Sequence, residues 1–444
     1  MISKLSNKPA KFLLVFATLL MLCFQAAAAE YAIIYTGNLD GELEPCGCSV
    51  EGNSGGILRR AQKLDELRAE NPDIFAISAG GLIYNGLTEE KLKSEYIFSG
   101  YAEIGYDAVA VQWADIRYGN EFATESGIPW VSSNWLTDEF IDTHVVTHEE
   151  QSLAFFGWLA PEDSPYRAMQ GQHRVVDGSA SDLANNLRQA RNNGHLTVLS
   201  STYSYEHAKE FFPLELVDIL MIKAAYEEYP DPQMLDGTLV LQPGSRGLRL
   251  GKLKLSFEAG KGITQWQHEV ISLPPAVPNA KRLEAWYQAY NDDVAKAYEA
   301  SIAARKASLN GLKSPFIGEK GCKSCHSQAH KIFKGTRHSK AFSTLERVNK
   351  AFDPECITCH SVGFNKPGGF VDVESTKHLK NVQCESCHGA GRAHAESAGQ
   401  AELGHHGWLP QEMCAQCHTQ PHSPSFNFEN YFTEIEHRND DTSP

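Results

Sequence analysis

The sequence predicts two domains: an α/β domain with a layered sheet, followed by a domain that is mostly helical and irregular. The chain has 444 residues, more than one hydrophobic core usually organises. From residue 30 to about residue 275, apolar runs typical of strands alternate with amphipathic stretches typical of helices. Beyond Ser314, Gly, His, Lys and Cys become frequent, and runs of Val and Ile disappear. A domain of that composition needs something other than a sheet to organise it.

The α/β region is predicted from apolar runs of strand length and from stretches with helical spacing. Strands are expected at residues 31–35, 74–79, 106–111, 196–200 and 218–222, and helices at residues 55–70 and 181–193. Residues 238–273 differ, because Pro243-Gly244, Gly251 and residues 260–262 interrupt them. These interruptions predict short antiparallel strands.

A Pro-rich break from Pro274 to Pro278 separates the two regions. Residues 279–309 are rich in Ala, Lys and Glu and predict a long helix that packs between the domains and ends near Asn310-Gly311. Its apolar and aromatic face consists of Leu283, Trp286, Tyr287, Tyr290, Val294 and Tyr298. The expected organisation is a signal peptide (1–29), an α/β domain (30–275), a helical linker (276–314) and a C-terminal domain (315–444).

The first 29 residues have the features of a secretory signal. A basic start is followed by the apolar stretch Phe12 to Phe24 and by Ala27-Ala28-Ala29, a small-residue cleavage site before Glu30. The apolar stretch is too short for a confident membrane span. Cys23 raises the alternative of a lipoprotein, which Leu22 disfavours. We therefore expect export to the periplasm, with an extracellular location as a second option and no stable membrane insertion after cleavage.

The pattern Cys-x-x-Cys-His occurs four times in the last third of the chain, and it is the attachment signature of a c-type haem. In such a motif the thiols form thioether bonds to the porphyrin and the His is the proximal iron ligand. Zinc ribbons are the alternative, but they give no reason for a His after every second Cys. We predict four covalently bound haem c groups. The motif residues are Cys322, Cys325 and His326; Cys356, Cys359 and His360; Cys384, Cys387 and His388; and Cys414, Cys417 and His418.

The remaining cysteines and the net charge limit the further sites and the classes of partner that the chain can have. Of 11 Cys, one lies in the signal and eight in the haem motifs, which leaves Cys46 and Cys48. The net charge of −15 argues against nucleic acid or anionic lipid as a partner. It permits docking to periplasmic redox proteins that donate or accept electrons.

Each proximal His leaves one axial position of its haem iron open. A second His there makes a low-spin haem suited to electron transfer, while an open position permits substrate binding. The C-terminal region has eight His outside the motifs, against six in the much longer N-terminal part, so several of the eight are expected to be ligands. These are His330, His338, His378, His394, His405, His406, His422 and His437. Met413 is the only nearby alternative ligand.

The N-terminal sequence resembles the periplasmic 5′-nucleotidase and calcineurin-like metallophosphoesterase family. Residues 33–45 are similar to its opening motif, and Gly55-Gly56-Ile57-Leu58-Arg59-Arg60-Ala61 to its following turn and helix. Residues 78–81, 105–108, 129–134 and 244–251 fall on further landmarks of the family. The resemblance covers roughly residues 31–273 and implies a sandwich of two mixed sheets flanked by helices.

The metal ligands of that family are missing from this chain. Where the family has Asp, His, Asn and bridging Asp ligands, this sequence has Asn38, Asp40, Gly81, Trp113, Ala114, Ser201, Ala224 and Tyr226. Gly, Ala and Trp offer no metal-binding side chain, although Asn38 and Asp40 could still hold one weakly bound cation. The two-metal hydrolysis of the family is therefore not expected here.

Cys46-Gly47-Cys48 follows the altered opening motif directly. Pro45-Cys46-Gly47-Cys48 is similar to a stretch in an exported variant group of this family. A Cys-x-Cys pair can close a strained, reducible disulfide or bind a metal through two thiolates. A structural disulfide or an inert loop pair is the alternative. Both interpretations stay open.

The C-terminal region from Phe316 onward resembles the nitrifier-type tetrahaem cytochrome c family. The carrying segments are residues 321–326, 336–341 and 382–394 and the last haem motif with Phe426, Tyr431 and residues 435–437. By this resemblance His338, His394 and His437 are the distal ligands. Family members often keep one haem without a second protein ligand, and the Cys356 haem is the candidate, because no further His lies between His360 and His378.

Two functions follow from these residues. The first is an exported electron carrier that passes electrons between periplasmic partners, with the phosphoesterase-like domain as a docking or redox module. The second is a redox enzyme that acts on a small molecule at an open haem or at the Cys46-Cys48 pair. Nucleotide hydrolysis is a distant third, because its metal ligands are absent.

Overall fold

The computed structural model describes residues 28–45, 53–83, 91–165, 175–223, 228–309, 311, 313–419, 422–423 and 425–437. The chain divides into two compact units, residues 1–44 with 55–281 and residues 45–54 with 282–444. In the described part, no helix combines the length and the apolar character that a membrane span requires.

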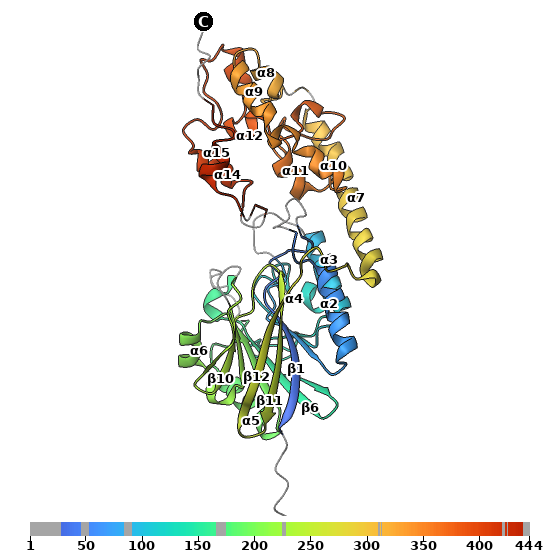
Figure 1. Ribbon diagram of the computed structural model, residues 1–444, viewed down its shortest axis with the longest axis vertical. Coiled ribbons are helices and arrows are strands. Elements are labelled where there is room, and N and C mark those ends of the chain that lie inside the picture. The colour runs from blue at the N-terminus through green and yellow to red at the C-terminus, as the bar shows by residue number, and fades with distance from the viewer. Residues whose placement is uncertain are drawn as a thin grey trace, which may run out of the picture. The chain divides into compact units, whose positions relative to one another are not determined.

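The N-terminal unit is a sandwich of two mixed sheets (Figure 1). The first has the order β12-β11-β1-β2-β3-β4, and the second has the order β5-β6-β7-β8-β10-β9. The first sheet comprises β1 (Ala29–Thr36), β2 (Phe75–Ser78), β3 (Ala108–Ala110), β4 (Trp130–Val131), β11 (Arg249–Glu258) and β12 (Gly262–Ser272). The second comprises β5 (His144–His148), β6 (Gln151–Trp158), β7 (Leu196–Ser201), β8 (Ile219–Ile222), β9 (Gln233–Leu235) and β10 (Thr238–Leu241).

Alternate residues of the strands fill the space between the sheets. Ile33, Ile77 and Val131 of the first sheet share one core with Phe155 and Val198 of the second. Because successive side chains of a strand point to opposite faces, residues such as Ile34 face the other way, and these too are fully buried. Both faces of the central strands are therefore covered, as expected for parallel strands in an α/β unit.

Helices cover the outer faces of the sandwich (Figure 1). The longer helices are α2 (Ile57–Glu70), α3 (Lys91–Ile104) and α5 (Ser181–Asn192), and the shorter ones are α4 (Asn120–Thr124), α6 (Tyr205–Phe211), η1 (Pro161–Asp163) and η3 (Leu214–Leu216). Leu183 and Leu187 of α5 pack with Phe156 of β6 in a second core. The helix spacing read from the sequence thus marks the faces that meet the sheets.

The structure corrects two sequence predictions for residues 238–273. Strand β10 pairs parallel with β8 and antiparallel only with β9, so this segment is not purely antiparallel. Gly251 does not end a strand but lies inside β11, paired with Val270 and Tyr35. A Cβ at position 251 would lie 2.3 Å from the Tyr35 ring, so Gly is needed there for close packing. The prediction of antiparallel strands on either side of residues 260–262 is confirmed, since β11 and β12 are antiparallel.

The boundary to the C-terminal unit falls within η4 (Lys281–Leu283), and the long helix α7 (Glu284–Leu309) follows. Tyr298 of α7 packs into a small core and donates a hydrogen bond to the carbonyl oxygen of Val371 at 2.8 Å. Arg305 lies over the Phe364 ring, 4.0 Å from its centre. The predicted helix therefore belongs to the same compact unit as the residues that follow it.

Short helices and loops make up the rest of this unit (Figure 1). They are α8 (Glu319–Cys322), α9 (Ser327–Gly335), η5 (Arg337–Lys340), α10 (Phe342–Arg347), α11 (Pro354–His360), η6 (Lys377–Leu379), α12 (Cys384–His388), α13 (Arg392–Glu396), α14 (Pro410–Ala415) and α15 (Phe428–Phe432). The core around Phe342, Leu345 and Ile357 is small. From residue 392 to residue 437, no described side chain is buried. The last haem motif therefore lies in chain that builds no hydrophobic core of its own.

Candidate functional site

Each Cys-x-x-Cys-His motif lies in or beside a short helix. The backbone N–H of His326 donates to the carbonyl oxygen of Cys322 at 3.0 Å, and His418 donates to Cys414 in the same way at 2.8 Å. The second and third motifs lie within α11 and α12. One helical turn places residues four apart on the same side, so the first Cys and the His of a motif point together. The eight motif cysteines form no disulfide bonds.

The motifs form two neighbouring pairs. The side chains of Cys322 and Cys384 lie within hydrogen-bond reach of each other. The side chains of Cys359 and Cys417 are neighbours in the same way. The first motif therefore lies against the third, and the second against the fourth.

Three His outside the motifs each face a motif His. The ring centres are 6.2 Å apart for His326 and His394, 6.0 Å for His418 and His338, and 5.8 Å for His388 and His437. A metal–imidazole nitrogen bond is about 2.0 Å long, so two imidazoles on opposite sides of one metal have ring centres roughly 6 Å apart. The three pairs therefore have the separation that bis-His ligation requires, and each joins His residues far apart in sequence.

Backbone carbonyl groups hold the other ring nitrogen of several of these His. The Nδ1 atoms of His394, His437 and His360 lie 2.7, 2.8 and 2.7 Å from the carbonyl oxygens of Ala401, Ile435 and Ala341. A carbonyl oxygen can only accept, so Nδ1 carries the proton and Nε2 is the nitrogen with a free lone pair. Such a second contact fixes the tautomer and the orientation of a metal-binding imidazole.

His360 of the second motif differs from the other three. Among the described residues, no second imidazole ring contacts it as His394, His338 and His437 contact their partners. Its pKa is lowered by burial and then by the nearby His422. His422 itself is bonded to the Thr419 hydroxyl at 2.9 Å through Nδ1.

The other His outside the motifs have different partners. His330 pairs with Glu319, and His406 pairs with Glu402 at 3.6 Å. His405 stacks on Trp408 with ring centres 4.7 Å apart. The residue pattern alone does not separate these His from His338, His394 and His437, because the distinction depends on contacts between distant segments; only the family resemblance singled those three out.

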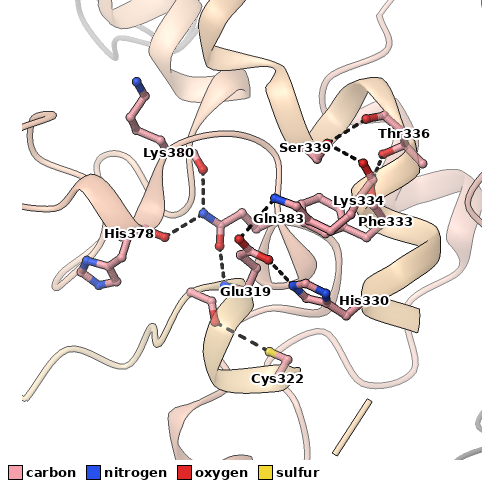
Figure 2. Close-up of polar contacts among 11 residues, drawn as sticks. Glu319, Cys322, His330, Phe333, Lys334, Thr336, Ser339, His378, Lys380 and Gln383 are labelled. Carbon is pink, nitrogen blue, oxygen red and sulfur yellow. Dashed lines mark hydrogen bonds and ion pairs between the residues drawn. The ribbon is translucent and has the colours of Figure 1, made fainter. Parts of the chain in front are cut away.

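A polar cluster ties the start of the first motif to the third (Figure 2). Gln383 accepts a hydrogen bond from the backbone N–H of Glu319 at 2.6 Å, and its amide donates to the carbonyl oxygens of His378 and Lys380 at 2.7 and 2.6 Å. The Glu319 carboxylate in turn contacts His330 and Lys334. Gln383, the residue before Cys384, thus holds α8, the helix that ends in Cys322, in position.

Glu385, inside the third motif, has a related role that the sequence does not reveal. Its carboxylate is 4% exposed and accepts hydrogen bonds from the backbone N–H groups of Ile317 (3.0 Å), Gly318 (2.8 Å) and Gly391 (2.8 Å). Gly391 precedes α13, which carries His394. One side chain therefore links the third motif to the approach of the first motif and to the helix that presents His394 to His326.

The N-terminal unit has a network of amides where the resemblance places metal ligands. Asn38 Nδ2 donates to Asp40 at 3.3 Å, and Gln112 Nε2 donates to Asn38 at 2.9 Å and to the Ala79 carbonyl oxygen at 2.8 Å. A Cβ at Gly81 would lie 2.5 Å from the Asn38 side chain. Asn38 therefore already occupies the space that a metal-binding side chain at position 81 would need.

Asp115 anchors the loops around this network. It is fully buried and accepts from the backbone N–H groups of Gly81, Gln112 and Leu82 at 2.9, 3.0 and 2.7 Å. Burial raises the pKa of Asp115 to about 6, against the effect of these hydrogen bonds. These contacts are to backbone groups, so Asp115 acts on loop structure.

The other substituted positions also lack the geometry of a metal centre. Trp113 Nε1 donates to the carbonyl oxygen of Ala160 at 2.8 Å, and Ser201 is buried at the end of β7. Among the described residues, no group of three or more His, Cys, Asp or Glu side chains could hold a metal ion. Ala224, Tyr226, Cys46 and Cys48 lie outside the described residues.

Comparison with known proteins agrees with this division. Residues 321–389 match the family described as cytochrome c554 and c-prime. Cytochrome c-554 of Nitrosomonas europaea is 41% identical over 95 residues, 18% of this chain and 40% of that protein. The chain therefore spans less than half of that relative, and the match supports covalently bound haem c in this region.

The N-terminal unit is similar to solved structures. A 5′-nucleotidase precursor from Thermus thermophilus is matched with a TM-score of 0.50 at 18% identity, covering 60% of this chain and 59% of that one. The sulfate thiohydrolase SoxB of the same organism is matched with a TM-score of 0.49 at 16% identity, covering 59% and 60%. At such identity the first match establishes the fold alone. The chain thus joins an N-terminal unit with the fold of a 5′-nucleotidase to a C-terminal region that matches the cytochrome c554 and c-prime family over residues 321–389.

Proposed function

We propose that the chain is an exported tetrahaem cytochrome c that transfers electrons between periplasmic redox proteins. The observation that carries the proposal is the set of three imidazole pairs, with ring centres 5.8–6.2 Å apart, each built from one motif His and one His outside the motifs. A haem c supplies an iron that takes up and releases single electrons.

The donor set fits four haem groups. Each motif would hold one haem through its two Cys and its proximal His. His394 would be the distal ligand of the haem held by His326, His338 that of the haem held by His418, and His437 that of the haem held by His388. The protein's own contribution is to fix these imidazoles by hydrogen bonds at Nδ1 and to hold neighbouring motifs together through Gln383 and Glu385. The absence of buried described side chains in residues 392–437 supports a haem as the organising centre there.

A second candidate function is reaction with a small molecule at the haem of His360. It is favoured by the lack of a facing imidazole for His360 among the described residues and by the Nδ1 contact to Ala341 that holds the ring. An iron with an open axial position can bind an exogenous ligand, whereas a bis-His iron resists it.

One experiment tests both functions on the oxidised holoprotein. Electron paramagnetic resonance should give three low-spin centres and one high-spin centre, and cyanide or nitric oxide should convert only the high-spin signal. Four low-spin centres would remove the second function. Several high-spin centres would overturn the assignment of His394, His338 and His437 and with it the electron-carrier proposal as stated.

The proposed location and the proposed role of the N-terminal unit follow from the same features. Export through residues 1–29 would bring the chain to the compartment in which its redox partners are expected, and N-terminal sequencing of the mature protein should begin at Glu30. The N-terminal unit would serve as a docking or redox module. The amide network of Asn38 and Gln112, in place of charged ligands, supports a role other than phosphoester hydrolysis.

A further inference from the structure

Helix α2 of the N-terminal unit carries a buried cation whose charge the described part of the chain leaves unmatched. Arg60 is 1% exposed and is among the largest fully buried side chains. Its Nη1 donates to the hydroxyls of Tyr101 at 2.6 Å and Tyr106 at 3.2 Å. Among the described residues, the hydrogen bonds of the Arg60 side chain go to these two phenols and none goes to a carboxylate. The carboxylates of Asp40 and Glu42 contact Arg246.

The two phenols are not a counter-charge. Burial raises the pKa of Tyr101, so its hydroxyl is neutral at physiological pH. Arginine does not lose its proton in proteins, so the guanidinium remains a cation. The Nε–H group is buried and has no acceptor among the described residues. A buried charge of this kind costs several kcal/mol unless an opposite charge and hydrogen-bond acceptors reach it.

A small cavity of about 10 Å³ lies against this side chain. Gly37, Asn38, Tyr229 and residues 244–249 line it together with Arg60. A cavity of this size has room for one water-sized species. The backbone of Gly247 runs so close that a Cβ there would lie 2.8 Å from Nη2 of Arg60. Gly247 has a φ of +62°, so glycine satisfies both the conformation and the space.

The surroundings favour an anion over water in that cavity. Arg60 belongs to the first turn of α2, whose N-terminal end carries partial positive charge, and no acidic residue occurs in that turn. We propose that Arg60 and this cavity bind a single monovalent anion of chloride size, which supplies the missing charge and accepts a hydrogen bond from the guanidinium.

Size and charge together predict selectivity. Chloride and bromide are monatomic and only moderately larger than water, so small shifts of the lining would admit them, while sulfate and phosphate are far too large for the cavity. The anion would bind the folded unit and not the unfolded chain, so it would raise thermal stability by mass action. At a tenfold excess over its dissociation constant the expected rise in Tm of the N-terminal unit is about 3–6 °C.

The test uses the full-length holoprotein. Its Tm should be measured by calorimetry in millimolar bromide, chloride and sulfate at constant ionic strength, with Arg60→Met and the exposed Arg188→Met as variants. Bromide and chloride should raise the Tm of the wild type and of Arg188→Met, and sulfate should not. A response that follows sulfate, or one that persists in Arg60→Met, would overturn the proposal, because sulfate stabilises proteins through general exclusion from their surface.

A measurement on the wild type covers the case in which Arg60→Met does not fold. Crystals soaked in bromide should show anomalous density beside the Arg60 guanidinium, at hydrogen-bond distance from Nε or Nη2. Bromide peaks elsewhere, with none at Arg60, would show that the cavity holds water and would reject the site.

Discussion

Replacement of Glu385 tests whether a single carboxylate positions both the attachment motif and the distal ligand of the haem proposed at His326. In Glu385→Ala the backbone N–H groups of Ile317, Gly318 and Gly391 lose their acceptor. An unsatisfied buried polar group costs about 1–3 kcal/mol, so three of them would cost about 3–9 kcal/mol if no water entered. Glu385→Gln keeps one acceptor oxygen, so its loss of stability should be about half that of Glu385→Ala.

The loss should appear in the haems as well as in stability. Gly391 precedes the helix that carries His394, and Ile317 and Gly318 precede the helix that ends in Cys322. Guanidinium unfolding followed by Soret absorption should show the lowered free energy of unfolding of the C-terminal unit. Electron paramagnetic resonance should show a changed low-spin signal for one centre.

The matched control is Glu402→Gln, which removes a carboxylate whose side chain is 76% exposed. It should leave both the unfolding midpoint and the low-spin signals unchanged, because exposed ion pairs contribute little. If Glu385→Ala unfolds at the same denaturant concentration as the wild type, or leaves every haem signal unaltered, the positioning role of Glu385 is refuted.

Four further predictions follow from the structure. A pyridine haemochrome assay with intact-mass measurement should give four haems per chain, and zinc without haem would contradict the motif assignment. His338→Ala should keep all four haems but convert one low-spin centre to high spin, while His378→Ala should not; equal spectra for the two variants would reject His338 as a ligand. Phosphate release from nucleoside monophosphates with added divalent metals should stay at background, because Asn38 and Gln112 already fill the centre; metal-dependent turnover would contradict this. Asp115 has a raised pKa of about 6, so its protonated form stabilises the fold at low pH. The free energy of unfolding should therefore fall by about 3 kcal/mol as pH rises from about 4 through 6. Stability curves of the wild type and Asp115→Asn against pH should therefore converge or cross in that window, and parallel curves would exclude the effect.

The sequence predicts the elements whose signal is local. Strands β1, β2, β7 and β8 are predicted because apolar runs bounded by turns mark strands buried on both faces, and α5 is predicted from its spacing. The strands β5 and β6 are not predicted. The interpretation of Gly251 as a strand break is wrong because its role depends on the Tyr35 ring of a neighbouring strand, which no local pattern contains.

The same difference between local patterns and contacts of distant segments applies to the candidate site. The haem motifs are local patterns and can be read directly. Which His faces which motif is a long-range property: His338 lies beside His418, and His437 lies beside His388. Glu385 escapes prediction because a carboxylate inside a haem motif gives no sign in the sequence that it will accept three backbone hydrogen bonds.

The contact between Asn38 and Gly81 also limits which side chains this part of the N-terminal unit can accept. Position 81 has a φ of +67°, and any Cβ there meets the Asn38 side chain, which Gln112 holds in place. An acidic residue introduced at position 81 alone would therefore destabilise the fold before it could bind a cation. An engineered metal site at this place has to begin with smaller side chains at positions 38 and 112, and only then add a carboxylate at position 81.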